Sequence, residues 1–420
     1  MPEIQNFDTL DLSQYIQAGD TVIWGQAQAE PLSLTENLIQ NRKKIGQFQI
    51  FLGIAQYPSC NLASTDYIQY LSYCGAGYNR LLAEKNALEI LPVHYSTLPH
   101  LMQQGCLNID VVLIQVSAPN ASGQYSYSLA HDYLKFALQH ARIVIAEVNA
   151  LAPWVYADEY LSADDFDVIV HTKREIMGET PALISPVNQR IADRVAEYIE
   201  DGATLQLGIG VLPNAIMQAL NHHRHLGIHS GIIGDGVAAL MQQGVITNEK
   251  KNIDQGKTVT GLISGSSELH RFVHQNPDIL LRGTDYTHNA QRLSHLNQFT
   301  AINSAIEVDL TGQVNAEIAN RRYVGAVGGA LDFVHAANQS QGGVSIIALP
   351  ASGKNFSRIV SQLQGPVSTP RSDVGIIVTE YGAADLRGLS IRQRVEKMLL
   401  ITDPQFRTSL EQQAMDLHYI

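Results

Sequence analysis

Short apolar runs rich in Val and Ile alternate along the chain with stretches in which apolar residues recur every three or four positions. The runs have the length of buried strands, and the amphipathic stretches have the period of helices that cover a sheet. We therefore predict an α/β protein with two similar domains built on mainly parallel sheets covered by helices. The predicted strands are DTVIWG (20–25), VVLIQVS (111–117), IVIAEVN (143–149), ATLQLGIG (203–210), SIIALP (345–350) and VGIIVTE (374–380). The predicted helices are LTENLIQNR (34–42), LKFALQHA (134–141), RIADRVAEYI (190–199), PNAIMQALNHH (213–223) and RVEKMLLI (394–401).

An internal repeat predicts where the two domains divide. YIQAGDTVIWG (15–25) aligns with YIEDGATLQLG (198–208), and each is followed by a proline, Pro31 or Pro213, that opens a predicted helix. A second pair of similar segments is DVVLIQVSAPNASGQYS (110–126) and DVGIIVTEYGAADLRG (373–388). The segment 175–189 carries Gly and two Pro, so we predict domains at 1–185 and 186–420.

Composition narrows the class of partner. The 420 residues carry 28 basic and 40 acidic side chains, a net charge of −12 that argues against nucleic acid as the main ligand. Three scattered cysteines without a CxxC pair argue against a disulfide framework or a zinc site. No apolar run reaches the roughly 20 residues of a membrane helix, and the start lacks a basic and apolar leader. We expect a cytoplasmic protein.

Glycine-rich turns are the first candidates for chemistry. LGIHSGIIGDG (226–236) reads as a strand that ends through three glycines before a helix beginning near Val237. Gly208 and Gly210 stand on another strand-to-helix turn, where backbone N–H groups can cradle a phosphate or an oxyanion. YVGAVGGALDF (323–333) places Gly328 and Gly329 where backbone donors can approach a ligand closely. Each segment is equally compatible with an unoccupied tight turn.

Charged residues and histidines supply two further clusters. Glu380 follows a predicted strand at its carboxyl end, where α/β enzymes place reactive groups, and Arg358, Arg371 and Arg387 flank that region. Surface ion pairing is the alternative explanation. The tract HHRHLGIH (222–229) has no ordered acidic or Cys partner, so we expect a solvated helix end and no metal site.

Together these segments resemble the acetyl-CoA hydrolase/transferase family, which includes the 4-hydroxybutyrate and butyrate CoA-transferases. The resemblance runs over nearly the whole chain and is carried most distinctively by GDGVAALMQQGVITN (234–248), AINSAIEVDLTGQVNAE (301–317), VGGALDF (327–333) and TEYGAADLRG (379–388). It implies two CoA-transferase-type domains, coenzyme A as the ligand and substrate carrier, an active site between the halves, and a homo-oligomer.

The resemblance also implies that the nucleophile is missing. In such transferases a glutamate attacks the acyl-CoA thioester, and the family motif reads His-Ser/Thr-Glu, two residues, Ser-Asp-Gly. Here His229 and Ser230 are followed by Gly231, so the position of the glutamate is vacant. Further departures from the family pattern are Gly234 for Ser, Ala330 for Gln, Ile318 for Ser and Ala118 for Pro.

Other positions that match the family persist and are the remaining candidate site residues. Asn276, Glu380 and the Gly328–Gly329 pair keep the pattern, with Glu380 or His229 as a candidate general base. Lys354 and Arg358 in PASGKNFSRIV (350–360) are candidate contacts for the CoA phosphates, together with Gly208 and Gly210.

Three functional hypotheses remain open. In the first, the acyl group passes directly from CoA to water or to a small nucleophile such as an amine or alcohol. In the second, ordinary transfer of CoA between carboxylates survives because another residue, such as Glu268, replaces the glutamate. In the third, the protein binds acyl-CoA without turnover.

Overall fold

The computed structural model describes residues 2–180 and 183–420, and its contacts divide the chain into two compact units. The first unit comprises residues 1–180, 259–287 and 322–328, and the second comprises 181–258, 288–321 and 329–420. Residues 181–182 of the predicted boundary segment lie outside the described residues. The division into domains at 185/186 concerned duplicated halves of the sequence, and it stays a prediction.

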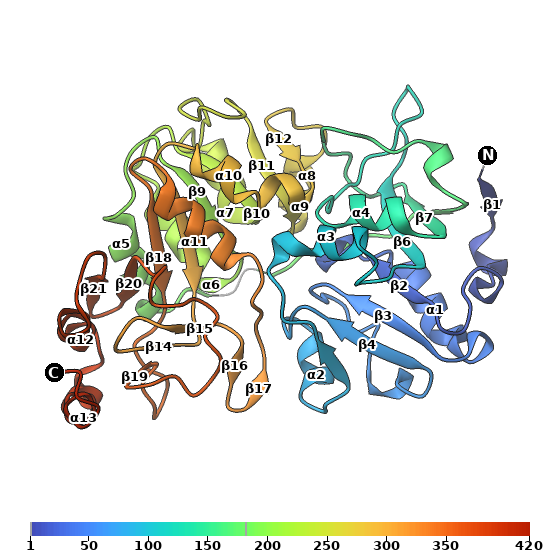
Figure 1. Ribbon diagram of the computed structural model, residues 1–420. Helices are drawn as coiled ribbons and strands as arrows, with labels where there is room; N and C mark the ends of the chain where they lie inside the picture. Colours follow the sequence, from blue (N-terminus) through green and yellow to red (C-terminus); the bar gives the residue numbers. More distant parts are fainter. Residues whose placement is uncertain (1, 181–182) are drawn as a thin grey trace. The chain divides into compact units, whose positions relative to one another are not determined.

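The first unit is built on one sheet in which every neighbouring pair of strands is parallel. The strand order is β1-β8-β7-β6-β2-β3-β4-β5 (Figure 1). Continuous burial along the central strands explains their unbroken apolar sequence. The strands are β1 (Glu3–Gln5), β2 (Thr21–Trp24), β3 (Phe48–Leu52), β4 (Ile68–Ser72), β5 (Leu88–Ile90), β6 (Val111–Ser117), β7 (Ile143–Asn149) and β8 (Val168–Thr172).

Helices and a returning segment complete the first unit. The α-helices before the returning segment are α1 (Leu32–Ile45), α2 (Asn79–Ala83), α3 (Leu98–Gln103) and α4 (Leu134–His140). Short 3-10 helices span Phe7–Thr9, Leu12–Gln14, Ala27–Ala29, Leu62–Ser64, Tyr95–Thr97 and Ala163–Asp165. The returning segment carries most of β11 (Thr258–Ile263), then α8 (Ser267–Val273), β12 (Ile279–Leu281) and α9 (Thr284–Thr287). Backbone bonds such as Ile263 N–H to the Leu129 oxygen, 2.8 Å, attach it.

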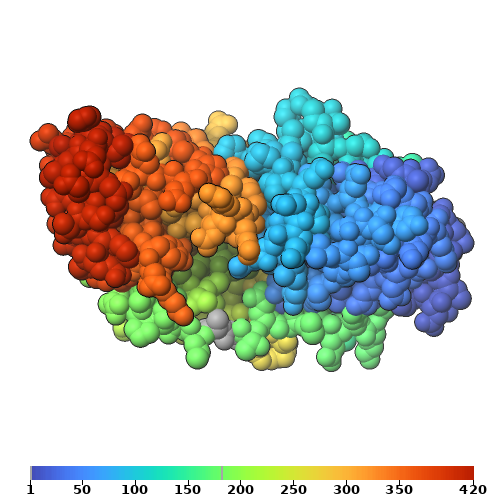
Figure 2. Space-filling model, turned by 90° about the horizontal axis from the view of Figure 1, so that it is seen from below, coloured from blue at the N-terminus to red at the C-terminus, as the bar shows by residue number. Residues whose placement is uncertain are grey.

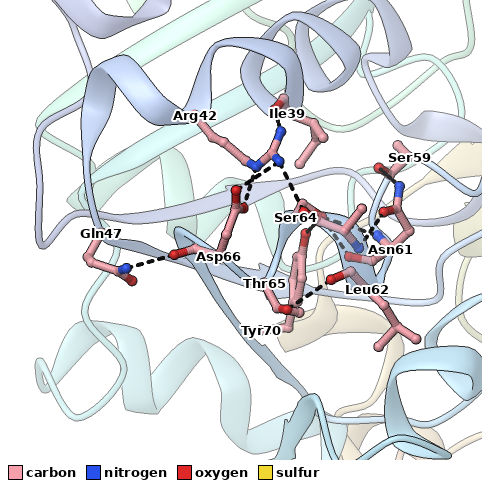
Figure 3. Close-up of polar contacts among 11 residues, drawn as sticks. Ile39, Arg42, Gln47, Ser59, Asn61, Leu62, Ser64, Thr65, Asp66 and Tyr70 are labelled. Atoms are coloured by element: carbon pink, nitrogen blue, oxygen red, sulfur yellow. Dashed lines mark hydrogen bonds and ion pairs between the residues drawn. The ribbon is translucent and has the colours of Figure 1, made fainter.

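Polar contacts fix the connection between β3 and β4 (Figure 3). The Arg42 guanidinium on α1 donates to both carboxylate oxygens of Asp66, at 2.6 and 3.0 Å. Asn61 and Ser64 form a reciprocal cap, and the Ser64 hydroxyl lies 2.6 Å from that of Tyr70. The connection is therefore held to both α1 and β4.

The second unit contains a parallel run of strands with one antiparallel edge. Its order is β10-β9-β13-β18-β20-β21, and only the β20–β21 pair of this run is antiparallel. These strands are β9 (Thr204–Leu207), β10 (Gly227–Ile233), β13 (Phe299–Ser304), β18 (Val344–Ala348), β20 (Ile376–Thr379) and β21 (Gly382–Asp385). Short strands β14 (Glu307–Asp309), β15 (Val314–Asn315) and β19 (Ile359–Val360) form a separate small sheet, and two-residue strands lie at β16 (Ile318–Ala319) and β17 (Arg322–Tyr323).

Helices pack against this run and bury its apolar side chains. They are α5 (Pro186–Ala196), α6 (Val211–Ala219), α7 (Asp235–Gln242), α10 (Ala290–Ser294), α11 (Ala330–Gln339), α12 (Ile391–Leu400) and α13 (Pro404–Asp416). The last two give the dark red surface in Figure 2. The predicted helix near Val237 begins two residues earlier, at Asp235, because Gly234 is already the N-cap and the acidic side chain suits the first turn.

Candidate active site

The carboxyl end of β10 carries Gly231, the position at which the resemblance implies a glutamate nucleophile in the family. Gly227 and Ile228 pair with β9, and the Ser230 hydroxyl donates to the carbonyl oxygen of Leu207, 2.9 Å away, at the end of that strand. His229 is fully buried. Gly231 follows and is half-buried, with a backbone that any residue could adopt. The backbone of β10 therefore does not require a glycine at this position.

The imidazole of His288 fills the space that a side chain on Gly231 would enter. A Cβ atom on Gly231 would lie 2.7 Å from Cε1 and 2.8 Å from Nε2 of His288. These separations are shorter than any real Cβ contact, so residue 231 can carry a side chain only if the ring moves. No motif in the sequence around His288 marks it as a site residue.

A second glycine borders the same ring. Gly329 is the N-cap of α11, and a Cβ there would lie 2.5 Å from both Cδ2 and Nε2 of His288. Its φ of −92° again allows any residue, so close approach is the reason for the glycine. Phe333, one turn into α11, packs its ring 4.6 Å from the imidazole centroid at 47°. His288 is thus held between β10 and the start of α11.

Burial controls the charge of this histidine. His288 is 6% exposed, and its removal from water lowers the pKa of the imidazole to about 3. The ring is therefore neutral throughout the physiological pH range and keeps one N–H donor and one acceptor nitrogen. The N-terminal end of α11 carries the partial positive charge of the helix dipole, which also disfavours a protonated imidazole nearby.

Gly328 belongs to the first unit and is a glycine for a different reason. Its φ is +56°, in the left-handed region, and its carbonyl oxygen accepts the Tyr95 N–H at 3.0 Å. This geometry fixes the backbone just before Gly329. The role of Gly328 and Gly329 as oxyanion donors stays a prediction.

Glu380 lies directly after β20, as predicted, and its carboxylate accepts the backbone N–H of Ala351 at 2.8 Å. Both residues are buried. The strand order places β20 four strands from β10, which corresponds to roughly 19 Å at about 4.8 Å per strand. Glu380 therefore shapes the loop that begins at Ala351, and its distance argues against a role as the base beside Gly231.

The other candidate contacts for CoA differ in whether their side chains already interact with other residues of the protein. Lys354 is exposed on the loop after β18, whereas the Arg358 guanidinium donates to the Ile306 oxygen at 3.0 Å and lies 5.5 Å from the Phe356 ring. Gly208 and Gly210 lie on the turn from β9 into α6, and a Cβ on either would meet only open space. The turn leaves room for a ligand there.

Asn276 is used locally in the first unit. Its side-chain amide donates to the Phe272 oxygen at 3.2 Å, and its side-chain oxygen accepts the Asp278 N–H at 3.0 Å. These bonds shape the turn between α8 and β12. The catalytic role of Asn276 stays a prediction.

The histidine tract forms no metal cluster. His223 contacts the Ile199 oxygen at 3.0 Å, and His225 pairs with Glu249 at 2.7 Å. Across residues 2–180 and 183–420, no group of three or more His, Cys, Asp or Glu side chains could hold a metal ion. Within the same residues, no helix is long and apolar enough to cross a membrane.

Comparisons with known proteins agree with the resemblance. The model of the acetyl-CoA hydrolase/transferase N-terminal domain matches residues 7–178, and that of the C-terminal domain matches residues 265–414. A 4-hydroxybutyrate coenzyme A transferase of Clostridium kluyveri is 35% identical over 403 residues, 94% of each chain. The crystal structure of RipA from Yersinia pestis superposes with a TM-score of 0.94 at 29% identity, over 100% of this chain and 98% of that one. A 4-hydroxybutyrate CoA-transferase of Porphyromonas gingivalis gives 0.84 at 31%, over 99% and 98%.

Proposed function

The chain belongs to the acetyl-CoA hydrolase/transferase family, and on this premise we propose that it binds an acyl-CoA and transfers the acyl group directly, without a glutamyl intermediate. It is an enzyme of the acyl-CoA transferase/hydrolase type. The observation that carries the proposal is the packing of His288 against Gly231, because a side chain at residue 231 would require the His288 ring to move.

The reaction follows from what the site retains. The oxygen or nitrogen of water, an alcohol or an amine forms a bond to the thioester carbonyl carbon, and the C–S bond breaks. The acceptor loses one proton and the CoA thiolate gains one, so the products are the acylated acceptor and free CoA thiol. Backbone N–H groups at Gly328 and Gly329 are the proposed donors to the oxyanion that forms.

Coenzyme A is the proposed ligand, and the glycine turn at 208–210 and the loop after β18 are its proposed contacts. Lys354 is exposed and is the better phosphate candidate, because Arg358 is already committed to a backbone oxygen and an aromatic ring. Glu380 supports this loop by accepting the Ala351 N–H.

Transfer of CoA between carboxylates is the second candidate, since the compared relatives are named for it. The proposed substitute nucleophile does not support it. Glu268 lies on α8 of the first unit, its side chain is 76% exposed, and it pairs with Arg271 at 2.8 Å. A carboxylate in bulk water beside a guanidinium is poorly activated as a nucleophile.

Mass spectrometry of all CoA species tests the proposal. The purified protein is incubated with short and medium acyl-CoAs, alone, with acetate, and with ethanolamine, which offers both an amine and an alcohol. Free CoA without acetate, or an acylated ethanolamine, supports direct transfer. Acetyl-CoA that forms only when acetate is present would establish carboxylate exchange in its place. Unchanged acyl-CoA in every mixture would leave binding without turnover.

A further inference from the structure

Two arginines of the second unit contact the same buried threonine without a carboxylate partner. Arg371 precedes β20 and is exposed, and Arg394 lies on α12 and is half-buried. The Arg371 guanidinium donates to the hydroxyl oxygen of Thr311 at 3.3 Å, and that of Arg394 donates to its carbonyl oxygen at 3.1 Å. Across residues 2–180 and 183–420, neither guanidinium forms an ion pair with a carboxylate. Surface ion pairing therefore does not explain Arg371.

The two positive charges lie close enough to repel one another. Burial lowers the pKa of Arg394, and the charge of Arg371 lowers it further. The neighbouring acidic side chains are bonded elsewhere. Asp309 accepts the backbone N–H and the hydroxyl of Thr311, and Asp373 pairs with a histidine on α11. The pair thus carries two positive charges that no side chain of the described residues neutralises.

Backbone oxygens hold Arg394 in place. Its guanidinium also donates to the carbonyl oxygens of Arg371 at 2.7 Å and of Leu389 at 3.3 Å. Gly312 allows this approach, because a Cβ at that residue would lie 3.3 Å from Nη1 of Arg394. Within the described chain, Nη2 of Arg394 and both Nε and Nη2 of Arg371 donate to no residue. One guanidinium is therefore fixed, and both keep N–H groups for a ligand.

We propose that Arg371 and Arg394 form a second ligand site, which binds the phosphoryl group of a small molecule other than the acyl-CoA substrate. The planar guanidinium presents paired N–H groups that match two oxygens of a phosphate, and bonds between these charged groups are strong. A phosphate dianion also offsets the repulsion between two cations, whereas a carboxylate carries only one negative charge. Such a local cluster can bind an anion even though the whole chain has a net charge of −12.

The position of the pair separates it from the candidate active site. The strands from β10 to β20 are all parallel, so their amino-terminal ends share one edge of the sheet. Arg371 precedes β20 and lies at that edge, whereas Gly231 lies toward the carboxyl end of β10. α12, which carries Arg394, packs against β21 at the side of the sheet remote from β10 (Figure 1). A bound phosphoryl group therefore need not contact a thioester at Gly231, and it can bind whether or not the proposed function holds.

Inorganic phosphate is the probe, and calorimetric titration of the full chain at constant ionic strength measures its binding. We expect saturable binding that the same titration with chloride does not reproduce. In Arg371→Gln the affinity should fall by about 10–100-fold, as expected for the loss of hydrogen bonds between charged groups. Arg371→Lys keeps the charge but not the paired N–H groups, so its affinity should lie between these two values. Because Arg371 is exposed, both variants should fold, which circular dichroism checks.

Arg387→Gln is the matched control. Arg387 follows β21 and is also exposed, but its guanidinium already pairs with Asp385 at 2.6 Å. The variant removes the same charge from the same unit, and it should bind phosphate nearly as tightly as the wild type. An equal loss of affinity in Arg387→Gln and Arg371→Gln would show that phosphate responds only to net charge, and it would overturn the site.

Titration of phosphate in the presence of saturating CoA identifies the source of the phosphoryl group. Unchanged phosphate binding supports a ligand other than CoA. Displacement by CoA would assign phosphate to the CoA-binding site and overturn a separate one. The absence of saturable binding, or equal binding in folded Arg371→Gln, would overturn the site altogether. Acyl transfer is measured independently by release of CoA, so failure of the proposed function does not affect these results.

Discussion

The imidazole of His288 occupies the space that a side chain at residue 231 would enter. Its Cε1 atom lies 2.7 Å from the position that a Cβ atom on Gly231 would take. The glycine on β10 and the position of a ring from the segment before α10 are therefore one structural feature. We expect changed chemistry and not a loss of the site, because a neutral heterocycle lies where the resemblance implies a carboxylate.

Gly231→Glu alone should not restore the family's chemistry. The new side chain must displace the His288 ring from between two elements, and overpacking of this kind costs about 1–3 kcal/mol. We expect a lower thermal midpoint and no acetate-dependent formation of acetyl-CoA. Gly208→Ala is the control, because a Cβ at Gly208 meets nothing within 4 Å, and it should unfold close to the wild type.

The double variant Gly231→Glu with His288→Ala should behave differently from either single change. Removal of the ring opens the volume that the glutamate needs, so part of the lost stability should return. Acetate-dependent exchange of CoA should appear only in this variant. Equal exchange in the single Gly231→Glu variant would show that His288 does not block the position.

Glu380→Ala should weaken the binding of acyl-CoA. The change leaves the buried Ala351 N–H without its acceptor, at a cost of about 1–3 kcal/mol, and loosens the loop that carries Lys354. We expect KM to rise several-fold while kcat changes less, and we expect Glu380→Gln to retain most binding because its amide oxygen still accepts. Glu396→Ala, an exposed change on α12, serves as the control. An unaltered KM in Glu380→Ala would argue against a CoA contact on this loop.

Because Lys251 is buried, the free energy of unfolding of the second unit should rise with pH in the alkaline range. Its ammonium donates to the oxygens of Ile228 and Lys257 at 2.9 and 2.6 Å, yet burial lowers its pKa from 10.5 to about 7. Between pH 7 and 10.5 the unfolded chain binds this proton and the folded chain does not, so stability rises with pH across that window. Lys251→Met should remove this rise from urea unfolding curves, and Lys250→Met, an exposed neighbour, should keep it.

Glu30 should have the opposite effect on the first unit, whose free energy of unfolding should fall as pH rises. Burial raises the pKa of its carboxyl from 4.5 to about 7, and the hydroxyls of Thr35 and Ser59 donate to it. The folded chain therefore holds a proton that the unfolded chain has released, so its stability falls as pH rises from 4.5 through 7. Glu30→Gln should lose this fall in unfolding experiments, and Glu89→Gln on the exposed side of β5 should retain it. Parallel curves for the wild type and Glu30→Gln would refute the assignment.

The hydrophobic pattern predicted β2, β6, β7, β9, β10, β18 and β20 of the two large sheets, and it missed other strands, such as β3, β4 and β13. The repeat between 15–25 and 198–208 is confirmed in position, because β2 and β9 begin and end 183 residues apart (204 − 21 and 207 − 24). The second pair of similar segments, 110–126 and 373–388, does not form strands at equivalent places in the two sheets. β6 is the neighbour of β2, whereas β20 lies three strands from β9, and similar buried strands in both units explain the likeness of their sequences.

The site was only partly predictable. That Gly231 takes the place of the family's glutamate stays a prediction from the motif around it. His288 lies 57 residues later in YTHNA (286–290), where nothing in the local pattern marks it. Its proximity depends on how α11 and β10 pack, and local periodicity does not encode that distance. Gly231 is the signal in the sequence that could have pointed to His288. A glycine at a motif position where the family motif has a side chain suggests that another side chain occupies that space.

The most direct test of the account is the intact mass of the protein during turnover of an acyl-CoA. Quenched samples are compared with the untreated protein while free CoA is followed in parallel. Direct transfer predicts that free CoA accumulates while the protein never carries CoA or an acyl group. A protein population that gains the mass of CoA would reveal an enzyme-bound thioester, and it would contradict the claim that this chain works without a carboxylate nucleophile.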